Sequence, residues 1–145
     1  MKTILLATGL AASLASASAS RAAGEVATPQ PAALSVELNA LADAGPACRL
    51  TFVLKSDLPG TVEKTSFEFA FFDKTGKVER LTALNFGKLQ KGRTSVRQFE
   101  VPGGACASYS RVLINAVKSC DGQPSVDVCE QALVTGNKTA IDFGR

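Results

Sequence analysis

The chain has 145 residues, with 16 Lys and Arg against 13 Asp and Glu, four Cys and no His. This length allows one domain of ordinary size, and the lack of His excludes the common Ser-His-Asp and Cys-His catalytic arrangements. Charges of opposite sign are interspersed along the chain, which argues against a surface for nucleic acid or anionic lipid.

Residues 1–22 have the pattern of a secretory signal peptide. Lys2 gives a basic start, the apolar run from Thr3 to Leu14 is too short to span a bilayer, and small residues suited to cleavage follow. Cleavage removes Lys2 and Arg21, two of the 16 Lys and Arg, and leaves 14 against 13 Asp and Glu. We predict a periplasmic or secreted protein, with no membrane insertion after cleavage and no nucleic-acid partner.

The folded part is expected at 34–145, after an Ala- and Pro-rich flexible leader at 23–33. From residue 34 onward, apolar and polar residues alternate with the period of half-buried strands, and turn residues separate the runs. The six predicted strands are 34–40, 48–56, 65–72, 78–86, 95–101 and 111–117.

This spacing of strands predicts an all-β fold, an Ig-like antiparallel β-sandwich of about six to eight strands. Nothing in the six-strand series has a helical period, and a small β-barrel is the alternative fold. The C-terminal part adds up to two strands, 131–134 and 139–143, on either side of a turn. The strand at 111–117 is apolar on both faces apart from Asn115, which is typical of a strand flanked by neighbours.

Four Cys in an exported chain predict two disulfides, and three pairings are possible. If the strand at 111–118 is unbroken, Cys106 and Cys120 are 14 residues apart and separated by up to ~46 Å, far beyond the ~7 Å limit of a disulfide. In an up-and-down series the second and sixth strands run the same way. Cys48 and Cys106, each at or just before the start of one of these strands, therefore lie at the same end of the sandwich, and Cys120 lies at the other end. We therefore predict the disulfides Cys48–Cys106 and Cys120–Cys129.

Catalytic, metal and redox roles are not expected. No Cys-x-x-Cys pair is present and Met1 is the single Met, so the usual ligand sets for zinc and copper are missing. Acidic residues that lie near each other, such as Glu68 and Asp73, fall by turns or on outward strand positions, where a solvated charge is the ordinary interpretation. We predict a protein that is not an enzyme and holds neither cofactor nor metal.

Five side chains are candidates for a binding surface. The strand phasing leaves Phe72 and Tyr109 outside the main core face, and Arg93, Arg97 and Arg111 can gather on one sheet face with Tyr109. Aromatic and Arg side chains are enriched among interface anchors, although isolated apolar and Arg residues are also common on ordinary surfaces. We predict a non-catalytic binding or accessory module with a protein partner in the envelope; the alternative is a protein that binds a small ligand or modulates an enzyme.

Residues 36–122 resemble small exported bacterial proteins labelled "Tat pathway signal sequence domain protein", most specifically in "LNAL" followed by "ACRL", in "FDKTG" and in "RVLIN". The resemblance implies a periplasmic β-sandwich with cysteines at Cys48, Cys106 and Cys120, and the family has no established biochemical activity that could be transferred to this chain. Arg21 is single, so the chain departs from the twin-arginine label. The order "FEFAFFDKTGKV" then "GKLQKGRTSVRQFEV" is also similar to FxLYD-type bacterial sandwich domains, which implies a fold but no function.

Overall fold

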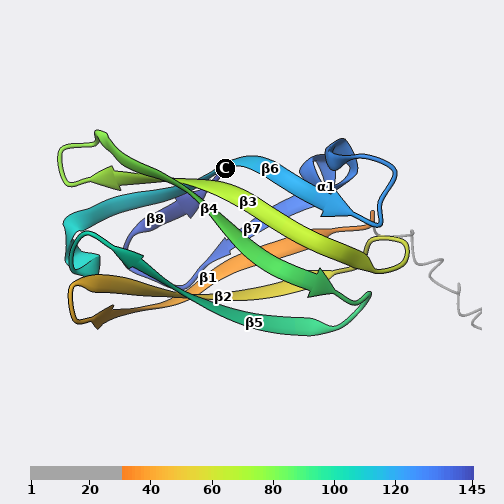
Figure 1. Cartoon of the computed structure of the whole chain (residues 1–145), viewed down its shortest axis with the longest axis horizontal. Coiled ribbons are helices and arrows are strands. Elements are labelled where there is room, and N and C mark those ends of the chain that lie inside the picture. The colour runs from red at the N-terminus through yellow and green to blue at the C-terminus, as the bar shows by residue number, and fades with distance from the viewer. Residues whose placement is uncertain (1–30) are drawn as a thin grey trace, which may run out of the picture.

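The computed structural model describes residues 31–145 (Figure 1). The predicted signal peptide, and the predicted leader up to residue 30, lie outside these residues. Residues 31–33 belong to no strand or helix. Asp57 donates its backbone N–H to the carbonyl oxygen of Ala33 at 2.8 Å, so the entry to the first strand is fixed against the end of the second.

Within residues 31–145 the chain forms eight strands, one α-helix and one short 3-10 helix. Their bounds are β1 (Leu34–Ala44), β2 (Ala47–Ser56), β3 (Val62–Asp73), β4 (Val78–Leu89), β5 (Thr94–Pro102), η1 (Cys106–Ser108), β6 (Tyr109–Asp121), α1 (Val126–Ala132), β7 (Leu133–Asn137) and β8 (Asp142–Gly144). The strands form two four-stranded sheets, ordered β5-β2-β1-β7 (the β2 sheet) and β4-β3-β6-β8 (the β3 sheet). The predicted all-β sandwich is confirmed.

The six predicted strands are present because each of them buries one face in the core between the sheets (Figure 1). On β3, for example, Phe67, Phe69 and Phe71 are fully buried, as their alternation with polar residues predicts. The ring of Phe52, from β2, packs against the ring of Phe69 with the centroids 5.3 Å apart. Aromatic contacts of this kind join the two sheets across the core.

Strand β6 departs from simple alternation. Its pairing with β3 shifts register three times, and its buried residues lie three, two, three and three positions apart. The buried residues are Tyr109, Val112, Ile114, Val117 and Cys120. These bulges explain why the sequence appears apolar on both faces: the inward face changes phase along the strand.

The C-terminal part contains features that the sequence analysis did not predict. Helix α1 follows β6, and the two strands after it pair in parallel rather than antiparallel: β7 with β1, and β8 with β6. Figure 1 shows α1 at the end of the sandwich where β6 ends. None of the helices in residues 31–145 has both the length and the apolar character needed to cross a membrane.

Both predicted disulfides are confirmed. Cys48, at the start of β2, bonds to Cys106, with 4.7 Å between the Cα atoms, and thereby joins the β2 sheet to the entry of β6. Cys120, near the end of β6, bonds to Cys129 of α1, with 6.1 Å between the Cα atoms. Two disulfides and no free Cys among the described residues fit an extracellular protein.

Candidate functional site

The five predicted binding residues do not form one surface. Phe72 and Arg111 lie side by side on the outer face of the β3 sheet, where the guanidinium carbon of Arg111 is 5.5 Å from the centroid of the Phe72 ring. This is the geometry of a cation–π contact. Arg93 and Arg97 lie elsewhere, at the turn from β4 to β5 and on β5. The three arginines predicted to cluster therefore lie at two separate places, Arg111 at one and Arg93 with Arg97 at the other.

The expected exposure of Tyr109 is wrong. Its side chain is 1% exposed, and its ring packs against the ring of Phe71 with the centroids 5.3 Å apart. The cause is a bulge at the start of β6, where Phe72 pairs with Arg111 but Asp73 pairs with Tyr109, so that Ser110 is the extra residue. One extra residue moves the next side chain to the opposite face, which turns Tyr109 into the core.

Of the four edge strands in the described part of the chain, β4 is the longest, with 12 residues. Strands β7 and β8 have 5 and 3 residues and lie beside each other, and β5 has 9 residues, with charged side chains at Arg97 and Glu100. By contrast, β4 is uncharged from Leu81 to Asn85. A long, uncharged edge presents unpaired backbone N–H and C=O groups to which another strand can bind.

An apolar surface continues from this edge onto the outer face of the β3 sheet. Leu81 is 57% exposed and lies directly opposite Ala70, which in turn lies opposite Leu113 on β6. In the next row, Val78 is opposite Phe72. Residues directly opposite each other share a face, so these side chains form one apolar surface that ends at the edge of β4.

The turn between β3 and β4 is held by Asp73. Its Oδ1 accepts hydrogen bonds from the backbone N–H groups of Thr75, at 2.8 Å, and of Lys77, at 3.0 Å. The hydroxyl of Thr75 also donates to this oxygen at 2.7 Å. These hydrogen bonds, led by that of the Thr75 side chain, lower the pKa of Asp73 below its ordinary value. The ionised carboxylate therefore fixes the start of β4.

Arg97 closes the other end of the β4 edge. Its Nε–H donates to the carbonyl oxygen of Phe86 at 2.9 Å, and its Nη2 donates to that of Lys88 at 3.4 Å. A third hydrogen bond, from Nη1, goes to the carbonyl oxygen of Val96 at 2.9 Å. The guanidinium thus occupies edge carbonyls that a further strand would need, and it leaves the part of β4 before Phe86 open.

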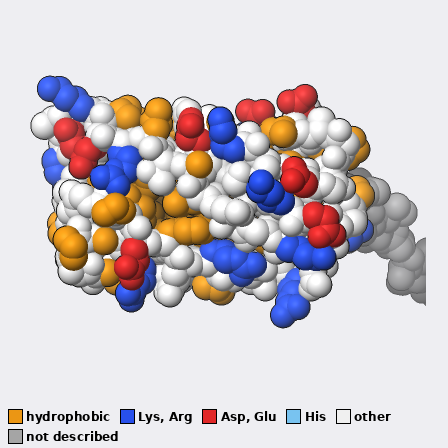
Figure 2. All heavy atoms as spheres, viewed as in Figure 1, with side chains coloured by type: hydrophobic (Ala, Val, Ile, Leu, Met, Phe, Trp, Pro, Cys, Tyr) orange, Lys and Arg blue, Asp and Glu red, His pale blue; other side chains and the backbone are white. Residues whose placement is uncertain are grey.

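A cationic hollow lies beside this closed end of β4. Figure 2 shows Lys and Arg side chains around the region where β4 ends and β5 begins, at the lower right of the view. The hollow has a volume of about 380 Å³ and is lined by Lys88, Gln90, Arg93, Thr94, Ser95, Val96 and Arg97. No carboxylate lines it.

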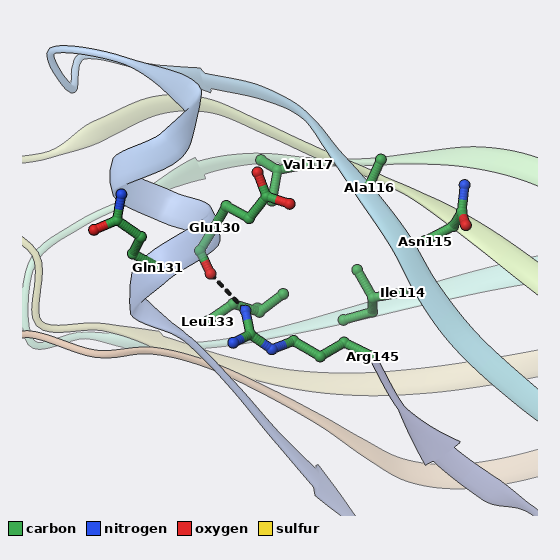
Figure 3. Close-up of a pocket in the computed structure, with 8 residues that line it drawn as sticks. All are labelled: Ile114, Asn115, Ala116, Val117, Glu130, Gln131, Leu133 and Arg145. Atoms are coloured by element: carbon green, nitrogen blue, oxygen red, sulfur yellow. Dashed lines mark hydrogen bonds between the residues drawn. The ribbon is translucent and has the colours of Figure 1, made fainter.

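A second hollow, of about 390 Å³, lies between β6 and α1 (Figure 3). Its polar groups do not converge. Arg145 donates from Nη1 to the backbone carbonyl oxygen of Glu130 at 2.6 Å, Asn115 donates to Glu68 outside the hollow at 2.7 Å, and Figure 3 shows the amide of Gln131 pointing away from the other side chains. The remaining lining residues are Ile114, Ala116, Val117 and Leu133.

Comparison with known protein families, curated proteins and solved structures gives no match. The candidate site, the open edge of β4, is therefore defined by its geometry alone. Its uncharged run, Leu81 to Asn85, is visible in the sequence, but a strand is identified as an edge only when the order of strands in the sheet is known. The contact of Arg97 with β4 gives no sequence signal either, because the side chain crosses from one sheet to the other.

Proposed function

We propose that the protein is a non-catalytic, exported binding module that holds an extended segment of a partner protein in the cell envelope against strand β4. The observation that carries the proposal is the open, uncharged edge from Leu81 to Asn85. Addition of a strand to an exposed sheet edge is a recurrent mode of peptide recognition, in which backbone hydrogen bonds give affinity and side-chain contacts give specificity.

The surroundings of the edge support this mode. The row of apolar side chains formed by Leu81, Ala70 and Leu113 runs across the strands and ends at the edge, where Leu81 offers an apolar contact to the side chain directly opposite it on an added strand. Asp73 at one end and Arg97 at the other fix the backbone of β4 before any partner binds. A rigid edge loses little conformational freedom on binding, which favours affinity.

Site-specific crosslinking in exporting cells tests the proposal. A photoreactive residue at Ala83 is expected to form a protein adduct, and Leu81→Lys is expected to reduce its yield about tenfold, because charged side chains protect edge strands from pairing. Val134→Lys is the matched control: Val134 is 54% exposed, close to the 57% of Leu81, but lies on an edge of the β2 sheet. An equal loss in both variants, or no adduct, contradicts the proposal.

A second candidate function is binding of a small ligand in the hollow between β6 and α1. Its volume of about 390 Å³ falls within the usual range of ligand pockets, and it combines apolar walls with the charged groups of Glu130 and Arg145 (Figure 3). Native mass spectrometry of protein isolated from the envelope tests this function. A bound molecule that is lost in Ala116→Trp supports it, and ligand-free protein contradicts it.

A further inference from the structure

The cationic hollow at the end of β4 has more positive charge than its own structure neutralises. Three cations, Lys88, Arg93 and Arg97, line it without any carboxylate. Lys88 pairs with Glu63 on β3 at 2.9 Å, and both side chains are about half exposed. Exposed pairs of this kind bind weakly. Within the described part of the chain, Arg93 and Arg97 form no ion pair, and both line the hollow of about 380 Å³.

The two arginines are held in place by neutral groups. Arg97 donates to three backbone carbonyl oxygens, which uses three of its five N–H groups. Arg93 donates from Nη1 to the side-chain oxygen of Gln90 at 3.1 Å. Both guanidinium groups therefore keep donors that their present contacts do not use. The hydroxyls of Thr94 and Ser95, which also line the hollow, can donate further hydrogen bonds.

This set of donors matches a carboxylate. Guanidinium groups bind carboxylates through parallel N–H···O bonds, and the hollow begins where the open edge of β4 ends, at the carbonyls held by Arg97. Ala83 and Lys88 are five residues apart, or about 17 Å along an extended strand. A strand paired with the open edge reaches the hollow within that distance.

We propose that the hollow receives acidic side chains of the partner segment, about five residues from the part that pairs with Ala83. That the carboxylates come from the partner segment rests on the proposed function of β4, whereas the binding of carboxylates by the hollow is independent of that function. The partner segment then has two parts: an uncharged extended run beside Leu81 and an acidic end beside Arg93.

A titration of the ¹⁵N-labelled protein with a blocked tetra-aspartate peptide tests the hollow by itself. The peptide is expected to shift the amide resonances of residues 88–97, and added salt is expected to reverse the shifts. Arg93→Ala is expected to weaken affinity about fivefold, the upper range for one exposed ion pair. Lys74→Ala, which removes a cation from the β3–β4 turn outside the hollow, is the control and leaves affinity unchanged.

Two further probes separate the outcomes. Blocked tetra-asparagine shifts nothing if charge is required, and sodium sulfate at equal ionic strength binds more weakly than tetra-aspartate if the hollow is built for peptide carboxylates. Equal affinity for sulfate, or an affinity for tetra-aspartate that is unchanged in Arg93→Ala, overturns the inference. Tetra-aspartate binding without any adduct from Ala83 supports the hollow and contradicts the strand site, so the two proposals fail separately.

Discussion

Gly122, in the turn after β6, lies where two backbones approach closely. Its φ is +93°, and a Cβ atom there would lie 2.6 Å from the carbonyl oxygen of Thr61. Gly76, in the β3–β4 turn, also has a positive φ, +83°, but has open space around it. We expect Gly76→Ala to lower the free energy of unfolding by about 1 kcal/mol, the cost of a left-handed conformation, and Gly122→Ala by at least about 3 kcal/mol, because the backbone must also move.

Urea unfolding of the two variants and the parent measures this difference. Gly144→Ala is the control, since Gly144 has neither a positive φ nor an atom near its added Cβ. Equal destabilisation by Gly76→Ala and Gly122→Ala would show that the close approach of Thr61 has no energetic weight.

Tyr109 is the single Tyr, and the chain has no Trp, so its ionisation can be followed directly by ultraviolet absorbance. Burial, and secondarily the charge of Glu79, raises the pKa of Tyr109 above its ordinary value of 10.0. The unfolded state then ionises at lower pH than the folded state, and stability falls as the pH rises above 10.0. We expect absorbance to show ionisation above this value, and Tyr109→Phe to remove part of the alkaline destabilisation.

The same substitution has a second expected result at neutral pH. The buried hydroxyl of Tyr109 has no hydrogen-bond partner within the described residues, and an unpaired buried hydroxyl destabilises a folded protein. Tyr109→Phe is therefore expected to retain or raise the free energy of unfolding measured in urea. A clear loss of stability would mean that the hydroxyl has a partner in solution.

At the scale of elements, Arg97 determines how much of β4 is open. Arg97→Ala frees the carbonyls of Phe86 and Lys88, and we expect it to lower the free energy of unfolding by about 1–2 kcal/mol and to increase self-association through the longer edge. Urea unfolding and sedimentation velocity measure the two effects. Arg93→Ala removes a neighbouring arginine whose side chain donates to Gln90 rather than to β4, and this variant is expected to remain monomeric and stable.

The six predicted strands follow from the sequence because each has a buried face that alternates with polar residues. Prediction from the sequence fails where contacts between distant parts of the chain determine the local structure. The bulges of β6 shift the phase that placed Tyr109 outside the core. Strands β7 and β8 are short and gain stability from parallel neighbours far along the chain, and α1 is held by its disulfide to Cys120. The same holds for the predicted binding surface, since the separation of Arg97 from Arg111 is known only when β5 and β6 are assigned to different sheets.

At the scale of the whole molecule, the two disulfides hold the fold in different ways. Cys48–Cys106 joins the two sheets and closes a separation of 58 residues, whereas Cys120–Cys129 holds α1 against β6 across 9 residues. The chain-entropy relation gives a stabilisation of about 4 kcal/mol for the first and about 2.6 kcal/mol for the second.

Replacing each Cys pair by Ala therefore gives two variants with a predicted order of stability. We expect the variant without Cys48–Cys106 to unfold at lower urea concentration, and hydrogen exchange in the variant without Cys120–Cys129 to rise mainly in α1 and the adjoining part of β6. The local disulfide also anchors the helix that lines the hollow between β6 and α1, because Cys129 lies next to Glu130 on α1. If its loss leaves exchange in α1 unchanged, packing against β6 holds the helix without the disulfide.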